Sequence, residues 1–136
     1  MGAKLTDSIR EALERKTYWH LATLNPDGSP QSTAVWIDTR GDKILVNSAL
    51  GRKKPRNIEH DPRVALSYHE HDKEGGYHSW GVQGRVVETI VGDEAEADID
   101  RLAVKYLGVT PYPFRSEGER RVTYVIEPLH VFEMGG

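Results

Sequence analysis

The chain has 136 residues, of which 38% are hydrophobic and 29% are charged, and its formal net charge is −3. This composition is typical of one globular domain spanning residues 1–136, and a mildly acidic chain is not built to neutralise a polyanion. The sequence contains no cysteine, which excludes disulfides, thiolate metal ligands and a cysteine nucleophile.

The sequence also lacks the patterns that direct a chain to a membrane or out of the cell. No apolar run approaches the ~20 residues that a membrane-spanning helix needs. Residues 1–16 lack the apolar centre of a signal peptide. We therefore expect a cytoplasmic protein.

The first part of the chain predicts a short helix followed by strands with tight turns. Leu5, Ile9 and Leu13 recur every four residues, which predicts an amphipathic helix over residues 7–16. Ser8 and Glu11 are placed to form its capping box. Strands are predicted at residues 18–25, 30–38 and 43–48, with Pro-Asp-Gly and Arg-Gly-Asp turns between them. Such short connections make the three strands antiparallel.

The second part predicts more strands and one longer helix. After a basic loop, a short helix is expected to begin near Arg56 and Asn57, and strands follow at residues 63–70 and 78–92. Two glycines inside the latter indicate a bulged, coiled strand of a barrel. Asp93 and Glu96 predict the start of a helix, and a Pro/Gly-rich loop at 108–119 leads to strands at 121–128 and 129–134. The elements predict a mainly β fold, a small, mostly antiparallel barrel of about six strands with peripheral helices.

Residues 51–62, GRKKPRNIEHDP, carry four cations within five positions. A segment that leaves a strand and enters a helix is suited to hold an anion, because a helix N-terminus presents free N–H groups and the positive end of the dipole. Gly51 permits close backbone approach, Pro55 suits a first helical turn, and Arg52 can donate two hydrogen bonds to one phosphate. The alternatives are an exposed solubilising loop, a nuclear-localisation tract and a nucleic-acid patch. The acidic residues that follow the cations argue against the last of these.

Other chemistries have weaker support in the sequence. His69 and His71 are two residues apart on a predicted strand, so both could face one Zn²⁺ ion, but a closed site needs further ligands from His78 or His20. The G-x-S-x-G pattern of serine hydrolases is absent. We therefore predict neither a metal site nor a catalytic acid–base pair.

The order of these segments resembles the pyridoxamine-5′-phosphate-oxidase-like split-barrel family of flavin and deazaflavin proteins. The matching stretches are residues 20–38, 43–67 and 80–87, together with the C-terminal part from residue 99. The most specific of them is R-x-K-x-R-N at Arg52, Lys54, Arg56 and Asn57, followed by D-P-R-V. This pattern is most similar to the branch that binds the deazaflavin coenzyme F-420.

The resemblance implies a six-stranded antiparallel split β-barrel that works as a homodimer with two cofactor sites at the subunit interface. Arg52 and Lys54 would hold the cofactor's phosphate, with Asn57 at the start of the helix, whereas Arg56 is a candidate for a solvated helix residue. The second strand would lie along the ring, with its backbone groups reading the ring's polar edge. The full set that the resemblance assigns to cofactor binding is Arg52, Lys54, Asn57, Ser32, Thr33, Ala34, Val35, Trp36, Ile37, Asn47, Ser48, Ala49 and Tyr68.

Several aromatic residues have both a functional and a structural interpretation. Trp36, Tyr68 and Trp80 are candidates for the walls of the ring pocket, or alternatively for the barrel core or a dimer contact. The loop residues Tyr112, Phe114 and Arg115 could cover a substrate, or the loop could be purely structural.

The resemblance implies an F-420-dependent oxidoreductase that transfers hydride between the cofactor and a small conjugated organic compound. The alternatives are an FMN-dependent oxidase-like enzyme and a carrier that binds flavin or deazaflavin without turnover. We expect a small-molecule substrate and neither nucleic acid nor membrane as a partner.

Overall fold

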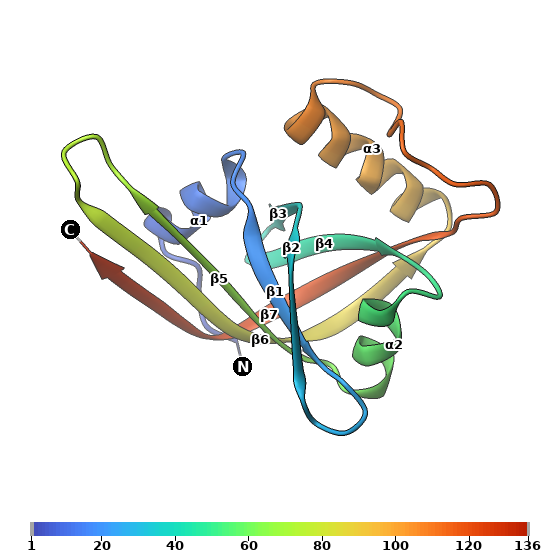
Figure 1. The fold of residues 1–136 in the computed structure, drawn as a ribbon, viewed down its shortest axis with the longest axis horizontal. Helices are drawn as coiled ribbons and strands as arrows, with labels where there is room; N and C mark the ends of the chain where they lie inside the picture. Colours follow the sequence, from blue (N-terminus) through green and yellow to red (C-terminus); the bar gives the residue numbers. More distant parts are fainter. Residues whose placement is uncertain (1, 136) are drawn as a thin grey trace.

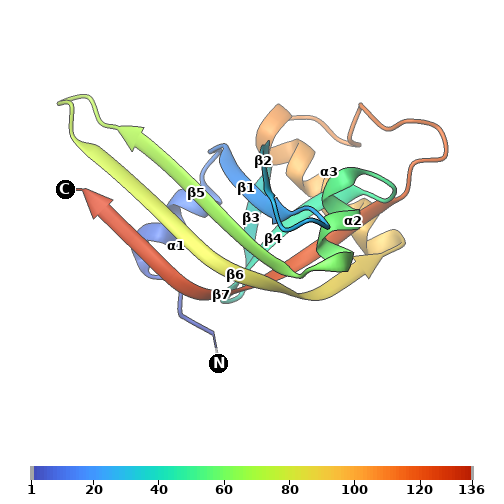
Figure 2. The same cartoon turned by 60° about the horizontal axis from the view of Figure 1, so that its bottom comes forward.

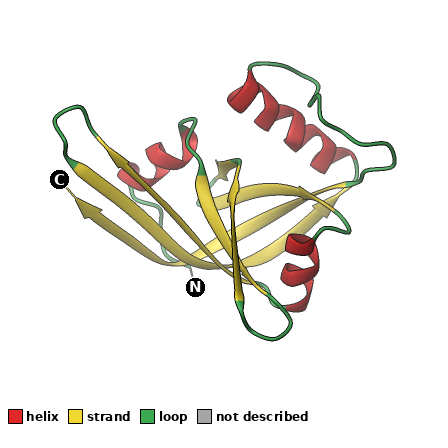
Figure 3. Ribbon diagram, viewed as in Figure 1, coloured by secondary structure: helices red, strands yellow, loops and turns green. Residues whose placement is uncertain are grey.

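A computed structural model describes residues 2–135 and shows one curled, antiparallel sheet of seven strands that forms an open half-barrel (Figure 1). Its strand order is β2-β1-β5-β6-β7-β4-β3. The strands are β1 (Trp19–Leu24), β2 (Pro30–Val35), β3 (Ile37–Arg40), β4 (Lys43–Ala49), β5 (Arg63–His71), β6 (Tyr77–Val91) and β7 (Arg121–Gly135). The helices are α1 (Asp7–Glu14), α2 (Lys53–His60) and α3 (Asp93–Leu107), placed at separate positions around the sheet (Figure 3).

The mainly β, antiparallel class is confirmed, but the strand count differs from the prediction. The strand expected at residues 30–38 is interrupted at Trp36, so that β2 pairs with β1 whereas β3 pairs with β4. These two short strands form opposite ends of the sheet. Residues 121–134, expected as two strands, belong to the single long strand β7. The split and the merger offset each other, so the sheet has seven strands, as many as were predicted individually and one more than the six-stranded barrel that was expected.

The bulges predicted for the long strand are present. The register between β6 and β7 shifts at Gln83/Gly84 and again between Val86 and Glu88. At Gly84 a Cβ atom would lie 2.6 Å from the carbonyl oxygen of Glu127 on the neighbouring strand. The glycine is therefore needed for the close approach of two backbones, as its position inside a strand indicated.

The predicted helix caps are wrong in detail. Thr6 is the N-cap of α1 and its hydroxyl accepts the Ile9 N–H at 3.3 Å, whereas the Ser8 hydroxyl accepts from the Trp80 indole at 3.1 Å. Gly92 precedes α3, and Glu96 contacts residues far along the chain instead of capping. The Ser8 and Glu96 side chains thus bind residues that are distant in the sequence, and a local pattern cannot predict such contacts.

Two hydrophobic clusters hold the helices on the sheet. The larger one fills the curl of the sheet and includes the fully buried Ile9 and Leu13 of α1 together with Trp19 of β1. The smaller one joins α3 to β4 through Leu45, Ile99, Leu102 and Tyr106. α2 contacts β1 and β4, and β4 carries the predicted site residues Asn47, Ser48 and Ala49.

Strands β5, β6 and β7 extend together well beyond the other strands (Figure 2). This extension carries the exposed side chains of Tyr77, Phe132 and Met134. None of the helices within residues 2–135 has the length and apolar character needed to cross a membrane.

Candidate functional site

The basic segment forms the beginning of α2. The helix starts at Lys53, three residues before the predicted start, with Arg52 as its N-cap and Gly51 in the left-handed region at φ +89°. Within the described chain, no side chain caps its first N–H groups. Cations in a first turn oppose the helix dipole, so this segment is locally unfavourable in the absence of an anion. A local rule broken in this way is typical of a functional site.

Lys54 is the half-buried cation of this turn. Its ammonium donates to the Thr33 hydroxyl on β2 at 3.2 Å. Burial lowers the pKa of Lys54 below its usual 10.5, and the nearby charges of Arg52 and Arg121 lower it further. Because this cation is partly desolvated and repelled by two others, a bound anion would stabilise its charged form.

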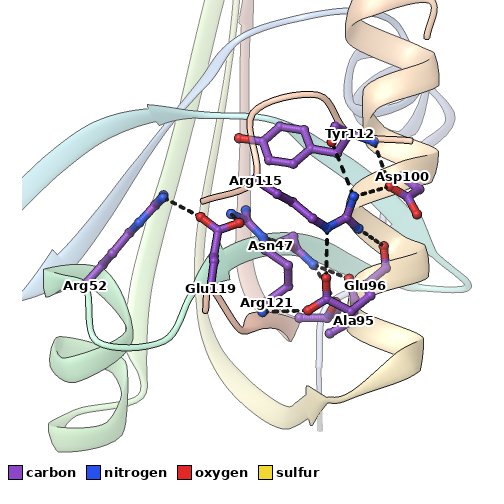
Figure 4. Close-up of polar contacts among 10 residues, drawn as sticks. Asn47, Arg52, Ala95, Glu96, Asp100, Tyr112, Arg115, Glu119 and Arg121 are labelled. Carbon is purple, nitrogen blue, oxygen red and sulfur yellow. Dashed lines mark hydrogen bonds and ion pairs between the residues drawn. The ribbon is translucent and has the colours of Figure 1, made fainter. Parts of the chain in front are cut away.

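Two residues that the sequence analysis missed complete the cluster (Figure 4). The Glu119 carboxylate lies 3.0 Å from the guanidinium of Arg52 and 3.2 Å from that of Arg121. Both the Glu119 and the Arg121 side chains are more than nine-tenths buried. We call Arg52, Lys54, Glu119 and Arg121 the basic site. Glu119 and Arg121 lie more than sixty positions from Arg52 in the sequence and carry no motif, so only the fold brings them together.

Asn47 is part of the support behind the basic site. Its side-chain oxygen accepts from Arg121 Nε at 2.9 Å, and its amide donates to Ala95 O and Thr123 Oγ1, each at 3.0 Å. The neighbouring Ser48 and Ala49 are buried. The three residues predicted to line the approach to the phosphodiester therefore orient Arg121 or fill the interior instead of forming an open surface.

Asn57 also differs from its predicted position at the helix start. It is the fifth residue of α2 and is buried, and its amide donates to Thr23 Oγ1 at 3.1 Å, Asn25 Oδ1 at 3.0 Å and Gln31 Oε1 at 3.4 Å. These bonds fix α2 on the β1–β2 hairpin. Asn57 is therefore placed to hold the helix, and through it the cations, in position. Arg56 is exposed, in agreement with its interpretation as a solvated residue.

Strand β2 offers a polar edge beside Lys54. It pairs with β1 on one side and is the end strand of the sheet. An end strand presents unpaired backbone N–H and C=O groups, which can bind the polar edge of a planar ring. Ser32 and Ala34 are exposed, Thr33 contacts Lys54, and Val35 is buried. Every second residue of the stretch 32–35 therefore has backbone groups that point away from β1, and these are compatible with backbone recognition of a ligand.

Trp36 and Ile37 are engaged in other contacts. The Trp36 ring stacks on Tyr106 of α3 at 5.1 Å and meets Tyr112 edge-on at 5.9 Å. Ile37 is fully buried, its N–H donates to the Tyr106 hydroxyl at 3.1 Å and its carbonyl accepts from Lys105 at 2.5 Å. Both backbone groups of Ile37 are thus engaged within the chain, so its contact with a cofactor stays a prediction that these bonds do not favour.

Tyr68 lies on β5, in a separate hollow lined by aromatic side chains and His20 and His69. Its ring stacks on Trp80 at 5.9 Å and its hydroxyl donates to Glu70 at 2.9 Å. Trp80 is buried in the main core, as the structural alternative for it predicted. Tyr68 would reach a cofactor at the basic site only from a second subunit.

The loop between α3 and β7 is tied down by Arg115. Its guanidinium lies 3.0 Å from the Glu96 carboxylate and 2.9 Å from that of Asp100 (Figure 4). Tyr112 is fixed by an N–H bond to Asp100 at 2.8 Å, whereas the Phe114 side chain is exposed. Arg115 is thus an anchor of the loop, and Phe114 is exposed while its ring contacts Tyr112 edge-on at 5.8 Å.

Metal binding by the histidine pair has no support in the geometry. His69 and His71 are both exposed on β5 with ring centroids 6.4 Å apart. Over residues 2–135, no three histidine, aspartate or glutamate side chains come together in a way that could hold an ion.

The basic site fits an organic phosphate. It offers a guanidinium, a half-buried ammonium and the N–H groups of a helix N-terminus, next to an open strand edge. These are the donor types that bind a phosphate and the polar edge of an attached ring. The residues described are binding and orienting groups, and chemistry at this site would come from the ligand they hold.

Comparisons with known proteins identify the family of the chain. A family model described as pyridoxamine 5′-phosphate oxidase matches residues 5–135. The pyridoxine/pyridoxamine 5′-phosphate oxidase of Rubrobacter xylanophilus is 33% identical over 90 residues, which cover 64% of this chain and 41% of that protein. The chain therefore spans less than half the length of this curated relative.

Two solved structures are similar over nearly the whole chain. One named F420 reductase is 32% identical with a TM-score of 0.77, covering 94% of this chain and 98% of its own. A conserved hypothetical protein from Mycobacterium tuberculosis has a TM-score of 0.78 at 20% identity, with 97% and 85% covered, which shows the fold alone. The sheet, the helix-borne cations and a match over residues 5–135 lead to one conclusion: the chain belongs to the pyridoxamine 5′-phosphate oxidase family.

Proposed function

We infer that this protein is an oxidoreductase that uses the deazaflavin coenzyme F-420. The observation that carries the inference is the first turn of α2, where Arg52 and Lys54 stand at an uncapped helix N-terminus beside the open edge of β2. The similarity to a protein named F420 reductase, at 32% identity over 94% of the chain, supports F-420 in particular.

In this proposal the chain binds and orients the cofactor. Arg52 and Lys54 hold the phosphate, Asn57 keeps α2 at the correct place, and the backbone of residues 32–35 contacts the polar edge of the ring. The bound deazaflavin supplies hydride transfer, and the substrate is a small conjugated compound that stacks against the ring. Phe114 is positioned to contact that substrate, because its side chain is exposed on a loop that Arg115 anchors.

A homodimer is part of the proposal. The extension of β5, β6 and β7 exposes Tyr77, Phe132 and Met134, which a second subunit would cover. Tyr68 would then reach the partner's cofactor from the aromatic hollow. Light scattering coupled to size-exclusion chromatography measures the mass directly, and a monomer at micromolar concentration would contradict this part.

A second candidate is an FMN-dependent oxidase. It is favoured by the similarity to the oxidase of Rubrobacter xylanophilus, which is 33% identical to this chain over 90 residues. FMN and F-420 both carry a ring and a phosphate, so Arg52 and Lys54 alone do not choose between them.

Titration of the purified protein with each cofactor tests the proposal. We expect F-420 to bind and FMN to be retained weakly. Oxidation of reduced F-420 in the presence of quinones, enones and tetrapyrroles then separates an enzyme from a carrier. The double variant Arg52→Ala/Lys54→Ala should weaken binding by a few kcal/mol, at ~1.5–3 kcal/mol for each charge-assisted bond. Unchanged F-420 affinity in that variant would contradict the site.

A further inference from the structure

Glu119 is an acidic residue inside a site that is otherwise positively charged. It lies at the end of the loop that precedes β7, and its two carboxylate oxygens contact Arg52 at 3.0 Å and Arg121 at 3.2 Å. Arg52 is the more exposed of the two guanidinium groups, with 55% of its side chain accessible, whereas Arg121 is only 4% accessible. The carboxylate thus connects the buried cation to the one that faces solvent.

The contact between Glu119 and Arg121 is incompletely satisfied. Glu119 Oε2 and Arg121 Nη1 are both buried and neither makes a hydrogen bond within the described residues, although they lie 3.2 Å apart. Buried polar atoms are nearly always hydrogen-bonded, so an exception requires an explanation. The simplest one here is that the carboxylate is held in the site by charge, between two cations that a ligand's phosphate would also approach.

The sign and size of a ligand's charge determine how it responds to this carboxylate. A phosphodiester, as in the tail of F-420, carries one negative charge and two terminal oxygens. A phosphomonoester, as in FMN, carries almost two charges above its second pKa of about 6 and has three terminal oxygens. Coulombic repulsion is proportional to the charge of the ligand, so Glu119 opposes a monoester about twice as strongly in free energy.

The donors of the site are also limited. Arg52 uses one Nη atom to bind Glu119, and the Lys54 ammonium already donates to Thr33. A diester with two terminal oxygens needs fewer of the remaining N–H groups than a monoester with three. The charge of the ligand and the number of N–H donors that it needs therefore both favour a diester over a monoester.

We propose that Glu119 is a specificity-determining residue, which makes the basic site select a phosphodiester over a phosphomonoester. The proposal deepens the proposed function and rests on it in one respect, namely that the basic site holds the phosphate of the cofactor. It assigns to one buried carboxylate the discrimination between F-420 and FMN that Arg52 and Lys54 cannot provide by themselves.

The expected effect follows from Coulomb's law. If the carboxylate and the phosphate lie about 7 Å apart on either side of Arg52, their repulsion in a water-like dielectric, which sets the lower limit for this buried carboxylate, reduces the affinity for a monoanion about threefold. The factor for a dianion is the square of that value, about tenfold. Glu119→Gln should therefore tighten FMN about tenfold and F-420 about threefold, which changes their ratio about threefold in favour of FMN.

FMN and riboflavin provide the decisive pair of ligands, since they share a ring and differ only in the phosphate. Dissociation constants are measured at pH 8 by fluorescence titration for the wild type, Glu119→Gln and the control Glu117→Gln, which changes an exposed carboxylate of the same loop. We expect riboflavin affinity to be equal in all three proteins and FMN affinity to rise only in Glu119→Gln. FMN binding that is weaker, unchanged or undetectable in that variant overturns the proposal.

A second comparison guards against loss of folding. Glu119→Gln leaves Arg121 buried without its counter-charge, which could destabilise the chain. The same substitution is therefore also made in an Arg121→Gln background, where a neutral amide replaces the buried guanidinium, and circular dichroism verifies the fold. There too, FMN must gain affinity relative to riboflavin.

This test is independent of the cofactor assignment. A wild type that does not bind F-420 contradicts the proposed function, whereas the FMN-to-riboflavin comparison still reports on Glu119. Binding of F-420 with an unchanged FMN-to-riboflavin ratio in Glu119→Gln retains the proposed function and removes only the role of Glu119.

Discussion

Replacement of Lys54 by methionine should weaken cofactor binding without a loss of stability. Methionine keeps the apolar stem of lysine and removes the charge. In the free protein the ammonium is partly desolvated, is repelled by Arg52 and Arg121, and makes one hydrogen bond of 3.2 Å to Thr33. The loss of one such bond costs about 0.5–1.5 kcal/mol, and relief of the burial and repulsion offsets it. We expect an unchanged or raised melting temperature for Lys54→Met.

The effect on binding should be large. A charge-assisted hydrogen bond to phosphate contributes about 1.5–3 kcal/mol, which corresponds to about a 10- to 100-fold increase in the dissociation constant of F-420. Calorimetric titration measures it, and Lys53→Met, which changes the exposed neighbour, is the matched control. A lysine of purely structural function would give the opposite pattern, a melting temperature lowered by several degrees and unchanged affinity.

The pH dependence of stability gives an independent check on Lys54. Because the pKa of Lys54 in the folded protein lies below its usual 10.5, the unfolded chain binds more protons between the two values. The destabilisation from Lys54 is therefore fully present below the folded pKa and disappears as the pH rises through 10.5. The stability advantage of Lys54→Met should be largest near neutral pH and decline in alkaline solution. An advantage that grows with pH would refute this reasoning.

Three further predictions concern the support of the site. Asn57→Ala removes the donor for three side-chain oxygens and should lower the free energy of unfolding by about 2–3 kcal/mol in urea, whereas Arg56→Ala on the same helix should change it by less than about 0.5 kcal/mol. Asp98→Ala leaves the buried Thr123 hydroxyl and the partly exposed Arg40 without the carboxylate they bind and should cost about 1.5–3 kcal/mol, with Glu94→Gln as the exposed control; a cost below about 1 kcal/mol would refute the importance of these two contacts. Arg115→Met should accelerate limited proteolysis between α3 and β7, and equal cleavage rates would contradict its function as the loop's anchor.

Much of the fold could be predicted because its signals are local. Turn residues, alternating strands and the four-residue repeat of Leu5, Ile9 and Leu13 depend on neighbours in the sequence, and these elements are present within a few residues of their predicted bounds. The break at Trp36 was not predicted. It depends on which strands the two halves pair with, and on the stacking of the Trp36 ring on α3.

The features of the candidate site also divide into those that depend on local sequence and those that depend on the tertiary structure. The sequence by itself determined that Gly51, Arg52 and Lys54 lie at the entrance to a helix, since glycine, proline and clustered cations act through local backbone geometry and charge. Only the tertiary structure decided that Asn47 orients Arg121 and that Asn57 fixes α2 on the β1–β2 hairpin. It also decided that the Ile37 N–H binds Tyr106, and that Glu119 pairs with Arg52 from more than sixty residues away. A side chain's partners are set by the packing of distant strands, and a carboxylate that pairs with Arg52 across the fold leaves no pattern in the sequence around it.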